Sequence, residues 1–206
     1  MQQQETVFER IVESLVERDY SVNDNFLNSN ELGILSKELH RHFEEGGLKK
    51  AGTGQGRGYQ QDKGIRGDYI SWVDAANLSV DCHFILDRLE ALALYLNQTC
   101  YLGIRKSEIH FALYPASTFY KRHLDVFQNT KSRKISIVCY LNEDWEAIHG
   151  GQIRLYVPDE NGNETGVDIL PIGGRLVCFK SDILEHEVLP AIRERCSITG
   201  WLKAAD

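Results

Sequence analysis

The chain has 206 residues, with 23 lysines and arginines against 30 aspartates and glutamates, and a formal net charge of −7. This length supports one domain with a sizeable core, and the negative charge disfavours a general nucleic-acid binder because it repels phosphate groups. A hydrophobic content of 42% without any apolar run of about 20 residues indicates a globular protein that does not span a membrane. The segment Met1–Glu5 lacks the basic start of a secretory signal, so we expect a cytoplasmic protein.

The cysteines agree with a reducing compartment. Their number is odd and no Cys-x-x-Cys pair occurs, which argues against a disulfide framework, a zinc site or a redox motif. Most of them lie among apolar residues, so we expect small buried thiols in the core. They are Cys82, Cys100, Cys139, Cys178 and Cys196.

Three amphipathic helices are predicted in the first half of the chain. The first carries apolar residues at three-to-four spacing, namely Val7, Phe8, Ile11, Val12 and Leu15. The second runs from about 30 to 45, since Asn28 with Glu31 resembles a capping box and Gly46–Gly47 ends the pattern. Its apolar stripe is Leu32, Leu35, Leu39 and Phe43. The third covers roughly 78–97.

A glycine-rich segment, residues 46–67, separates the second and third helices. It contains eight glycines, and no Gly-Lys-Ser/Thr follows them that would make a phosphate-binding loop. Five basic residues against Asp62 alone give it a local charge of +4. The pattern leaves two interpretations open, a solvated flexible loop and a mobile finger that binds a partner.

From residue 108 onward the pattern changes to short alternating strands without helices between them. The predicted strands are 109–113, 135–141, 153–157, 167–170, 175–180, 187–189 and 196–202. Such a series indicates an antiparallel sandwich or barrel. We therefore expect an α+β protein with one domain, 1–206. A double-stranded β-helix of the jelly-roll kind would span about 108–203, and supporting helices about 1–100.

Two His-x-acid motifs could begin a metal site with two histidines and one carboxylate. His42 and Glu44 fall in a predicted helix, where positions i and i+2 do not share a face, so we interpret them as surface residues. His123 and Asp125 fall in the stranded half, where i and i+2 point to the same side and can chelate one ion. The second motif is the candidate site.

A third ligand must come from a distant strand, and His186 is the candidate. Arg195 begins a later strand in which Thr199 and Trp201 share its face. An inward guanidinium needs an anionic partner, and its planar fork matches a carboxylate through two parallel hydrogen bonds. Arg193 shares that face but lies nearer the preceding turn, so we prefer Arg195.

These residues and their surroundings resemble the Fe(II)- and 2-oxoglutarate-dependent dioxygenases, and within them the prolyl 4-hydroxylases of the hypoxia-sensing type. The resemblance covers about 48–201, and the chain's small size resembles the bacterial members. The motifs that carry it are Ile65–Trp72, Tyr114–Pro115, Tyr120–Asp125, Tyr140–Trp145, Gly150–Leu155, His186–Ala191 and Ile198–Trp201.

The resemblance implies a role for individual residues. His123, Asp125 and His186 would bind Fe(II) and form the catalytic centre. The residues implied for 2-oxoglutarate are Arg195, Tyr140, Thr199 and Tyr114. Those implied for substrate are Arg133, Trp201, Asp68 and, in the finger loop, Arg57. Dioxygen would be the second cosubstrate and ascorbate the reductant.

The implied reaction converts a prolyl residue of a protein to trans-4-hydroxyproline, consumes O2 and releases succinate and CO2. The basic finger favours a protein substrate with an acidic surface, and the resemblance makes elongation factor Tu a candidate. We expect neither a nucleic acid nor a membrane as partner. A nucleic-acid demethylase is disfavoured by the net charge, and because Trp201 replaces a second arginine six positions after Arg195. Two alternatives stay open: a 2-oxoglutarate oxygenase for another side chain or a small molecule, and a metal-free jelly-roll binding module.

Overall fold

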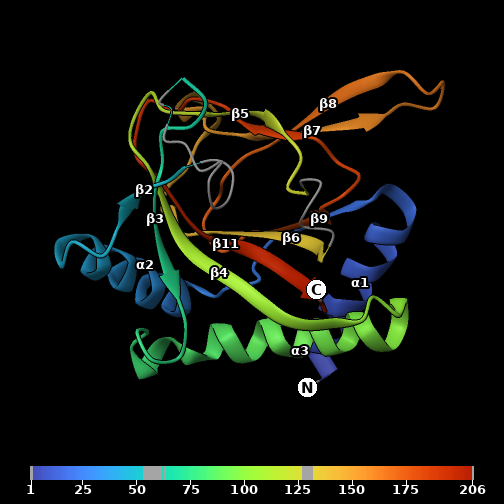
Figure 1. The fold of residues 1–206 in the computed structure, drawn as a ribbon, viewed down its shortest axis with the longest axis horizontal. Coiled ribbons are helices and arrows are strands. Elements are labelled where there is room, and N and C mark those ends of the chain that lie inside the picture. The colour runs from blue at the N-terminus through green and yellow to red at the C-terminus, as the bar shows by residue number, and fades with distance from the viewer. Residues whose placement is uncertain (1, 53–61, 63, 127–131, 206) are drawn as a thin grey trace.

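The structure, a computed structural model, describes residues 2–52, 62, 64–126 and 132–205. Two antiparallel sheets face each other, and the helices cover the outer face of the larger sheet (Figure 1). The larger sheet has the strand order β1 (Tyr20–Asn23), β9 (Leu176–Lys180), β6 (Arg133–Tyr140), β11 (Arg195–Ala204), β4 (Ile104–Tyr114), β3 (Tyr69–Val73), β2 (Lys49–Lys50). The smaller sheet has the order β5 (Tyr120–His123), β10 (His186–Val188), β7 (Ile153–Pro158), β8 (Glu164–Ile169). This arrangement confirms the predicted jelly roll with supporting helices.

The three predicted helices are present as α1 (Gln2–Arg18), α2 (Ser29–Glu44) and α3 (His83–Cys100). The capping box before α2 forms as expected, with reciprocal hydrogen bonds of 3.0 Å between Asn28 and Glu31. The third helix begins later than predicted because Val80–Cys82 forms a separate 3-10 turn. Among the described residues, no helix combines the length and the apolar character that a membrane crossing requires.

The inner face of α2 differs from the predicted stripe. Phe43 is 51% exposed, whereas His42 is only 6% exposed and its Nδ1 lies 2.8 Å from the hydroxyl of Ser71 on β3. The interpretation of His42 as a surface residue was therefore wrong. The helix turns His42 inward with Leu35 and Leu39, since those positions follow the same three-to-four spacing, and a serine on the facing strand satisfies one ring nitrogen.

The main hydrophobic core lies between the helices and the larger sheet, with fully buried side chains such as Ile11, Leu35, Leu89 and Phe111. As expected, the cysteines are free thiols and four of the five are buried. A second cluster, which includes Tyr140, Leu155 and Phe179, fills one end of the space between the two sheets. A third, smaller cluster comprises Ala112, Tyr114 and Val188.

Four strands were not predicted: β1, β2, β3 and β5. Each is short and lies at the edge of a sheet or next to one, where pairing with the neighbouring strand rather than a long alternating pattern determines the conformation. Strand β2 lies within the glycine-rich segment and pairs with β3. Residues 53–61 and 63 of the predicted finger, Arg57 among them, lie outside the described residues, so its mobility stays a prediction.

Gly200 is a position on β11 where the sheet leaves no room for a side chain. A Cβ atom there would lie 2.0 Å from the carbonyl oxygen of Glu108 and 2.7 Å from Cα of Ile109. We expect Gly200→Ala to lower the free energy of unfolding by about 3 kcal/mol, measured by urea denaturation. Gly33→Ala, on α2 with no atom within 4 Å, is the control and should raise it by about 0.5–1 kcal/mol. Equal midpoints for Gly200→Ala and wild type would contradict this packing.

Candidate active site

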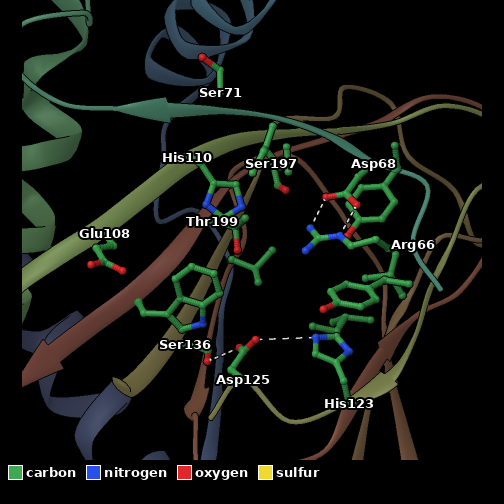
Figure 2. A pocket seen from close by; sticks show the side chains of 18 of the residues that line it. Arg66, Asp68, Ser71, Glu108, His110, His123, Asp125, Ser136, Ser197 and Thr199 are labelled. Carbon is green, nitrogen blue, oxygen red and sulfur yellow. Dashed lines mark hydrogen bonds and ion pairs between the residues drawn. The ribbon is translucent and has the colours of Figure 1, made fainter. Parts of the chain in front are cut away.

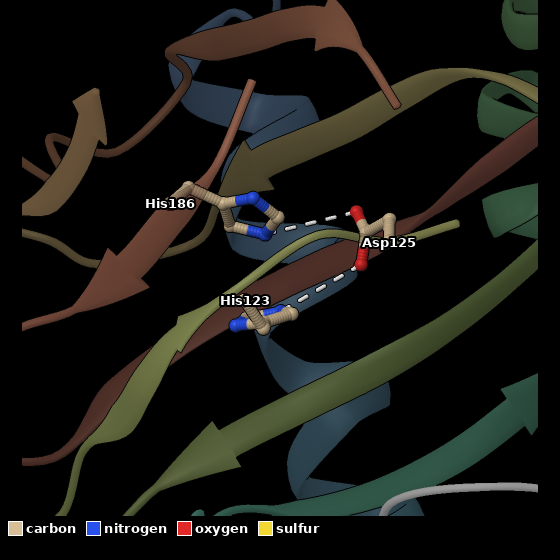
Figure 3. A group of neighbouring side chains, drawn as sticks. All are labelled: His123, Asp125 and His186. Carbon is tan, nitrogen blue, oxygen red and sulfur yellow. Dashed lines mark ion pairs between the residues drawn. The ribbon is translucent and has the colours of Figure 1, made fainter. Parts of the chain in front are cut away.

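Two neighbouring strands of the smaller sheet bring His123, Asp125 and His186 together (Figure 3). His123 ends β5, Asp125 follows it by two residues, and His186 begins β10 in register with His123. Nε2 of His123 lies 3.7 Å from Oδ1 of Asp125, and Nε2 of His186 lies 3.7 Å from its Oδ2. One potential ligand atom from each residue lies within 4.8 Å of the others. The three side chains therefore converge on one point, although 61 positions of chain separate Asp125 from His186.

The hydrogen bonds of the two imidazoles prepare them for a metal ion. Nδ1 of His123 donates to the carbonyl of Lys121 at 2.7 Å, and Nδ1 of His186 donates to that of Leu184 at 3.3 Å. A carbonyl only accepts, so Nδ1 carries a proton in both rings, and in the neutral form of each ring the lone pair is on Nε2, the atom that faces Asp125.

The protonation states agree with this. Burial lowers the pKa of His186 to about 4, so its ring is neutral at pH 7. Burial alone would raise the pKa of Asp125, but its interactions with His186, His123 and Ser136 hold that pKa below its usual range. Two neutral imidazoles and one carboxylate are the protonation states in which these residues bind a divalent cation.

Neighbouring side chains fix the ligands in place. The hydroxyl of Ser136 on β6 donates to Oδ2 of Asp125 at 2.6 Å, and Nη1 of Arg133 donates to the backbone carbonyl of Asp125 at 2.8 Å. The ring of Tyr120 stacks on His123 with 3.6 Å between centroids. Such contacts orient metal ligands and raise the affinity of a site.

The cavity beside these ligands has a volume of about 770 Å³ and lies between the two sheets (Figure 2). Its floor is the inner face of the larger sheet. The period-2 pattern predicted for β11 is confirmed, since alternate residues line the cavity and those between them pack in the core. The lining residues of this strand are Arg195, Ser197, Thr199 and Trp201.

Arg195 is 2% exposed and lies at one end of the cavity floor. Its Nε donates to the carbonyl of Gly151 at 2.9 Å, and its Nη2 donates to the hydroxyl of Tyr140 at 3.3 Å. No carboxylate of a described residue forms an ion pair with it. A buried charge without a counter-charge is costly, so the site fits a ligand that brings its own carboxylate. Arg193, the alternative, is exposed and contacts the carbonyl of Asp144.

The other residues expected at 2-oxoglutarate lie near Arg195 or along the floor. Tyr114 is opposite Arg195 on β4 and lines the cavity, with its ring 5.1 Å from the guanidinium carbon. Tyr140 is fully buried in the cluster between the two sheets and reaches Arg195 through its hydroxyl. The hydroxyl of Thr199 lines the cavity and donates to the carbonyl of Ile137 at 2.7 Å.

The residues expected at the substrate occupy different environments. Arg133 lies over the ring of Trp201 at 3.4 Å, at the end of the floor away from Arg195. Asp68 also lines the cavity, but it is only 1% exposed and Arg66 binds both of its carboxylate oxygens, at 2.7 and 2.5 Å. Arg57 lies outside the described part of the chain.

Several cavity residues were not singled out from the sequence. They are Arg66, Tyr120, Ser136 and His110. The signal for two of them was present, because β4 and β6 alternate with the same period as β11. His110 is four residues before Tyr114, and Ser136 is four residues before Tyr140.

Comparison with known proteins identifies the family. The 2OG-Fe(II) oxygenase superfamily matches residues 109–203, a range that contains the His–Asp–His group and Arg195. The crystal structure of a prolyl-4-hydroxylase from Pseudomonas putida is 38% identical, with a TM-score of 0.85 over 97% of this chain and 100% of that chain. The chain belongs to the 2OG-Fe(II) oxygenase superfamily.

Two further relatives of this oxygenase are prolyl hydroxylases. One from Trichoplax adhaerens, solved in complex with a peptide fragment of hypoxia inducible factor, is 28% identical with a TM-score of 0.84 over 98% of this chain and 91% of that chain. The hypoxia-inducible factor prolyl hydroxylase of Caenorhabditis elegans is 32% identical over 95% of this chain, which spans only 28% of that protein. The family uses Fe(II), 2-oxoglutarate and O2, as the resemblance predicted, and the donor set and the unpaired Arg195 fit the first two.

The convergence of the three ligands can be tested by metal binding alone. We expect Asp125→Ala to weaken Mn(II) binding, measured by anaerobic titration calorimetry, by about 100-fold or more, because it removes the only anionic ligand. Asp182→Ala, an exposed carboxylate before β10, is the control and should bind Mn(II) like wild type. Circular dichroism should show an intact fold in both variants. Unchanged Mn(II) affinity in Asp125→Ala would rule out this site.

Proposed function

We propose that this oxygenase hydroxylates a prolyl residue of a protein to trans-4-hydroxyproline, with His123, Asp125 and His186 as the ligands of Fe(II). The observation that supports it most is the buried guanidinium of Arg195, which has no counter-ion among the described residues and shares one cavity with the three potential ligands. The three potential ligands suit a metal ion, and the guanidinium in the same cavity suits a dicarboxylate. It favours an enzyme over a metal-free binding module.

In this proposal each residue of the cavity has a defined task. Arg195 binds the distal carboxylate of 2-oxoglutarate through its remaining donors, while Gly151 and Tyr140 hold the guanidinium in place. Tyr114 and Thr199 form the walls on either side of that diacid. The bound iron supplies O2 activation, coupled to the conversion of 2-oxoglutarate to succinate and CO2. The surrounding sheets exclude bulk water.

The relatives and the outer end of the cavity support this substrate class. The Trichoplax adhaerens enzyme was solved with a peptide, which supports a polypeptide substrate here. Arg133 and Trp201 lie where such a chain would enter, and the Arg66–Asp68 pair forms part of the wall. The basic glycine-rich segment, with Arg57, favours an acidic protein surface. Elongation factor Tu remains a candidate on the resemblance alone.

The role of Arg195 predicts a specific kinetic change. We expect Arg195→Ala to raise the KM for 2-oxoglutarate by about 100-fold, since it removes a charge-assisted bidentate pair, measured as succinate release. Arg193→Ala removes an exposed arginine next to it in the chain and should leave this KM within twofold. The same KM in Arg195→Ala and wild type would refute the assignment.

The substrate can be found by comparing cells that express wild type with cells that express Asp125→Ala. We expect mass spectrometry to detect at least one protein whose prolyl residue gains one oxygen atom with wild type only. Purified elongation factor Tu is incubated with wild type and, separately, with Asp125→Ala, and its prolyl residues are examined by the same mass spectrometry. If no protein gains oxygen on proline while wild type still converts 2-oxoglutarate to succinate, the oxygenase acts on another substrate and the prolyl proposal fails.

A further inference from the structure

His110 lies in the floor of the active-site cavity without an assigned task. It is on β4, where Trp72 of β3 and Thr199 of β11 are its partners in register (Figure 2). Its side chain lines the cavity and is only 4% exposed. His110 therefore lies in the same wall as the groups proposed for 2-oxoglutarate. Its partner in register, Thr199, is two residues after Ser197 on β11.

The imidazole of His110 is buried without hydrogen bonds. Nδ1 is fully enclosed and has no partner, and Nε2 has none among the described residues either. The ring contacts Trp72 and Trp201, with centroid distances of 4.9 and 5.7 Å. A leucine or methionine would make these apolar contacts without the cost of the buried, unpaired Nδ1. Within the described part of the chain, neither nitrogen of His110 therefore has a structural partner.

The state of the ring defines what it can bind. Burial, and the charge of Arg66, lower the pKa of His110 to about 4, so the ring is neutral at pH 7 and has one donor and one acceptor. Nδ1 is enclosed with no acceptor beside it, and a buried donor without an acceptor is less favourable than a buried acceptor without a donor. The proton is therefore best placed on Nε2, the nitrogen that the cavity can reach. This makes His110 a donor toward a ligand.

The same end of the cavity has other donors without acceptors. Nε1 of Trp201 and Nε of Arg133 are buried and unpaired. The nearby carboxylate of Glu108 is taken up by Lys203 at 2.7 Å. Neither an indole nor a guanidinium can accept, so a ligand here must supply acceptor oxygens. A neutral imidazole favours a neutral acceptor, such as a peptide carbonyl, over a second carboxylate.

We propose that His110 is a specificity-determining residue whose Nε2–H donates to a main-chain carbonyl oxygen of the substrate, next to the residue that is hydroxylated. This rests on the proposed function, because it takes a polypeptide as the substrate. It assigns a task in substrate binding to a residue that the iron ligands and the 2-oxoglutarate site do not use.

Four variants test the proposal. His110→Leu removes both nitrogens, His110→Gln places an amide N–H near the position of Nε2, and His110→Asn places one near Nδ1. His40→Leu removes an exposed imidazole on α2 as the control. The probe is the proline-centred peptide that wild type hydroxylates fastest, chosen from a set with varied flanking residues. For each protein we would measure the peptide KM and kcat, peptide-independent succinate release, and the melting temperature.

We expect His110→Leu to raise the peptide KM by about tenfold or more, while peptide-independent succinate release stays within twofold and the melting temperature is equal or higher. His110→Gln should bring the peptide KM most of the way back to the wild-type value. His110→Asn should behave like His110→Leu, and His40→Leu should behave like wild type. A structural histidine would give the opposite result, with a lower melting temperature and loss of both activities.

Three results would overturn the inference. One is a peptide KM within twofold of wild type in His110→Leu. Another is recovery by Asn but not by Gln, which would contradict the assignment of Nε2. The third is a loss of stability and of peptide-independent turnover in both His110→Leu and His110→Gln. A wild type that releases succinate but hydroxylates no prolyl peptide contradicts the proposed function first, and the inference falls with it.

Discussion

A positive charge buried without a counter-ion among the described residues is the constraint on which this cavity depends. Arg195 is almost completely enclosed, and within the described part of the chain its guanidinium donates only to a carbonyl and a phenol. Those neutral groups orient the guanidinium but do not neutralise its charge. The fold tolerates this because the long pairing of β11 with β4 and β6 holds the strand rigidly on both sides. In the proposed function a bound dicarboxylate offsets the free energy that this burial costs, which would couple the stability of the protein to occupancy of its site.

The opposite wall of the cavity contains a buried negative charge in a similar situation. Asp125 is a buried carboxylate whose neighbours are two imidazoles and a hydroxyl. In the proposed function a cation supplies its counter-charge, as a carboxylate of the cosubstrate does for Arg195. Each imidazole is held by a carbonyl two residues before it in its own strand segment. The site is therefore preorganised, and little side-chain freedom remains to be lost when a metal ion binds.

Much of this could be predicted because strands repeat every two residues. That period groups His123 with Asp125, and Arg195 with Thr199 and Trp201, from the sequence alone. Sequence spacing does not pair β5 with β10 in one register: it makes His186 a candidate as a histidine on a distant strand, and the resemblance to a known family implies its role as the third ligand. The edge strands β1 and β2 were missed because a few residues with no periodic signal take their conformation from a neighbouring strand. His42 was misjudged because a buried histidine and an exposed one look alike until the facing Ser71 is known.

The register between β5 and β10 has a consequence for how this protein can vary in length. His186 faces His123 only while the connection before β10 keeps its present number of residues, because a shift by one position turns a strand residue to the other side of its sheet. An insertion or deletion between Ser181 and Glu185 that shifts β10 by one position would therefore turn His186, a proposed ligand, away from His123 without changing any of the three proposed ligands. The hairpin at Asp159–Asn163 joins β7 and β8 at an exposed tip, so added residues there leave that register intact. Of these two connections, the hairpin is therefore the one that can change in length without displacing a proposed iron ligand.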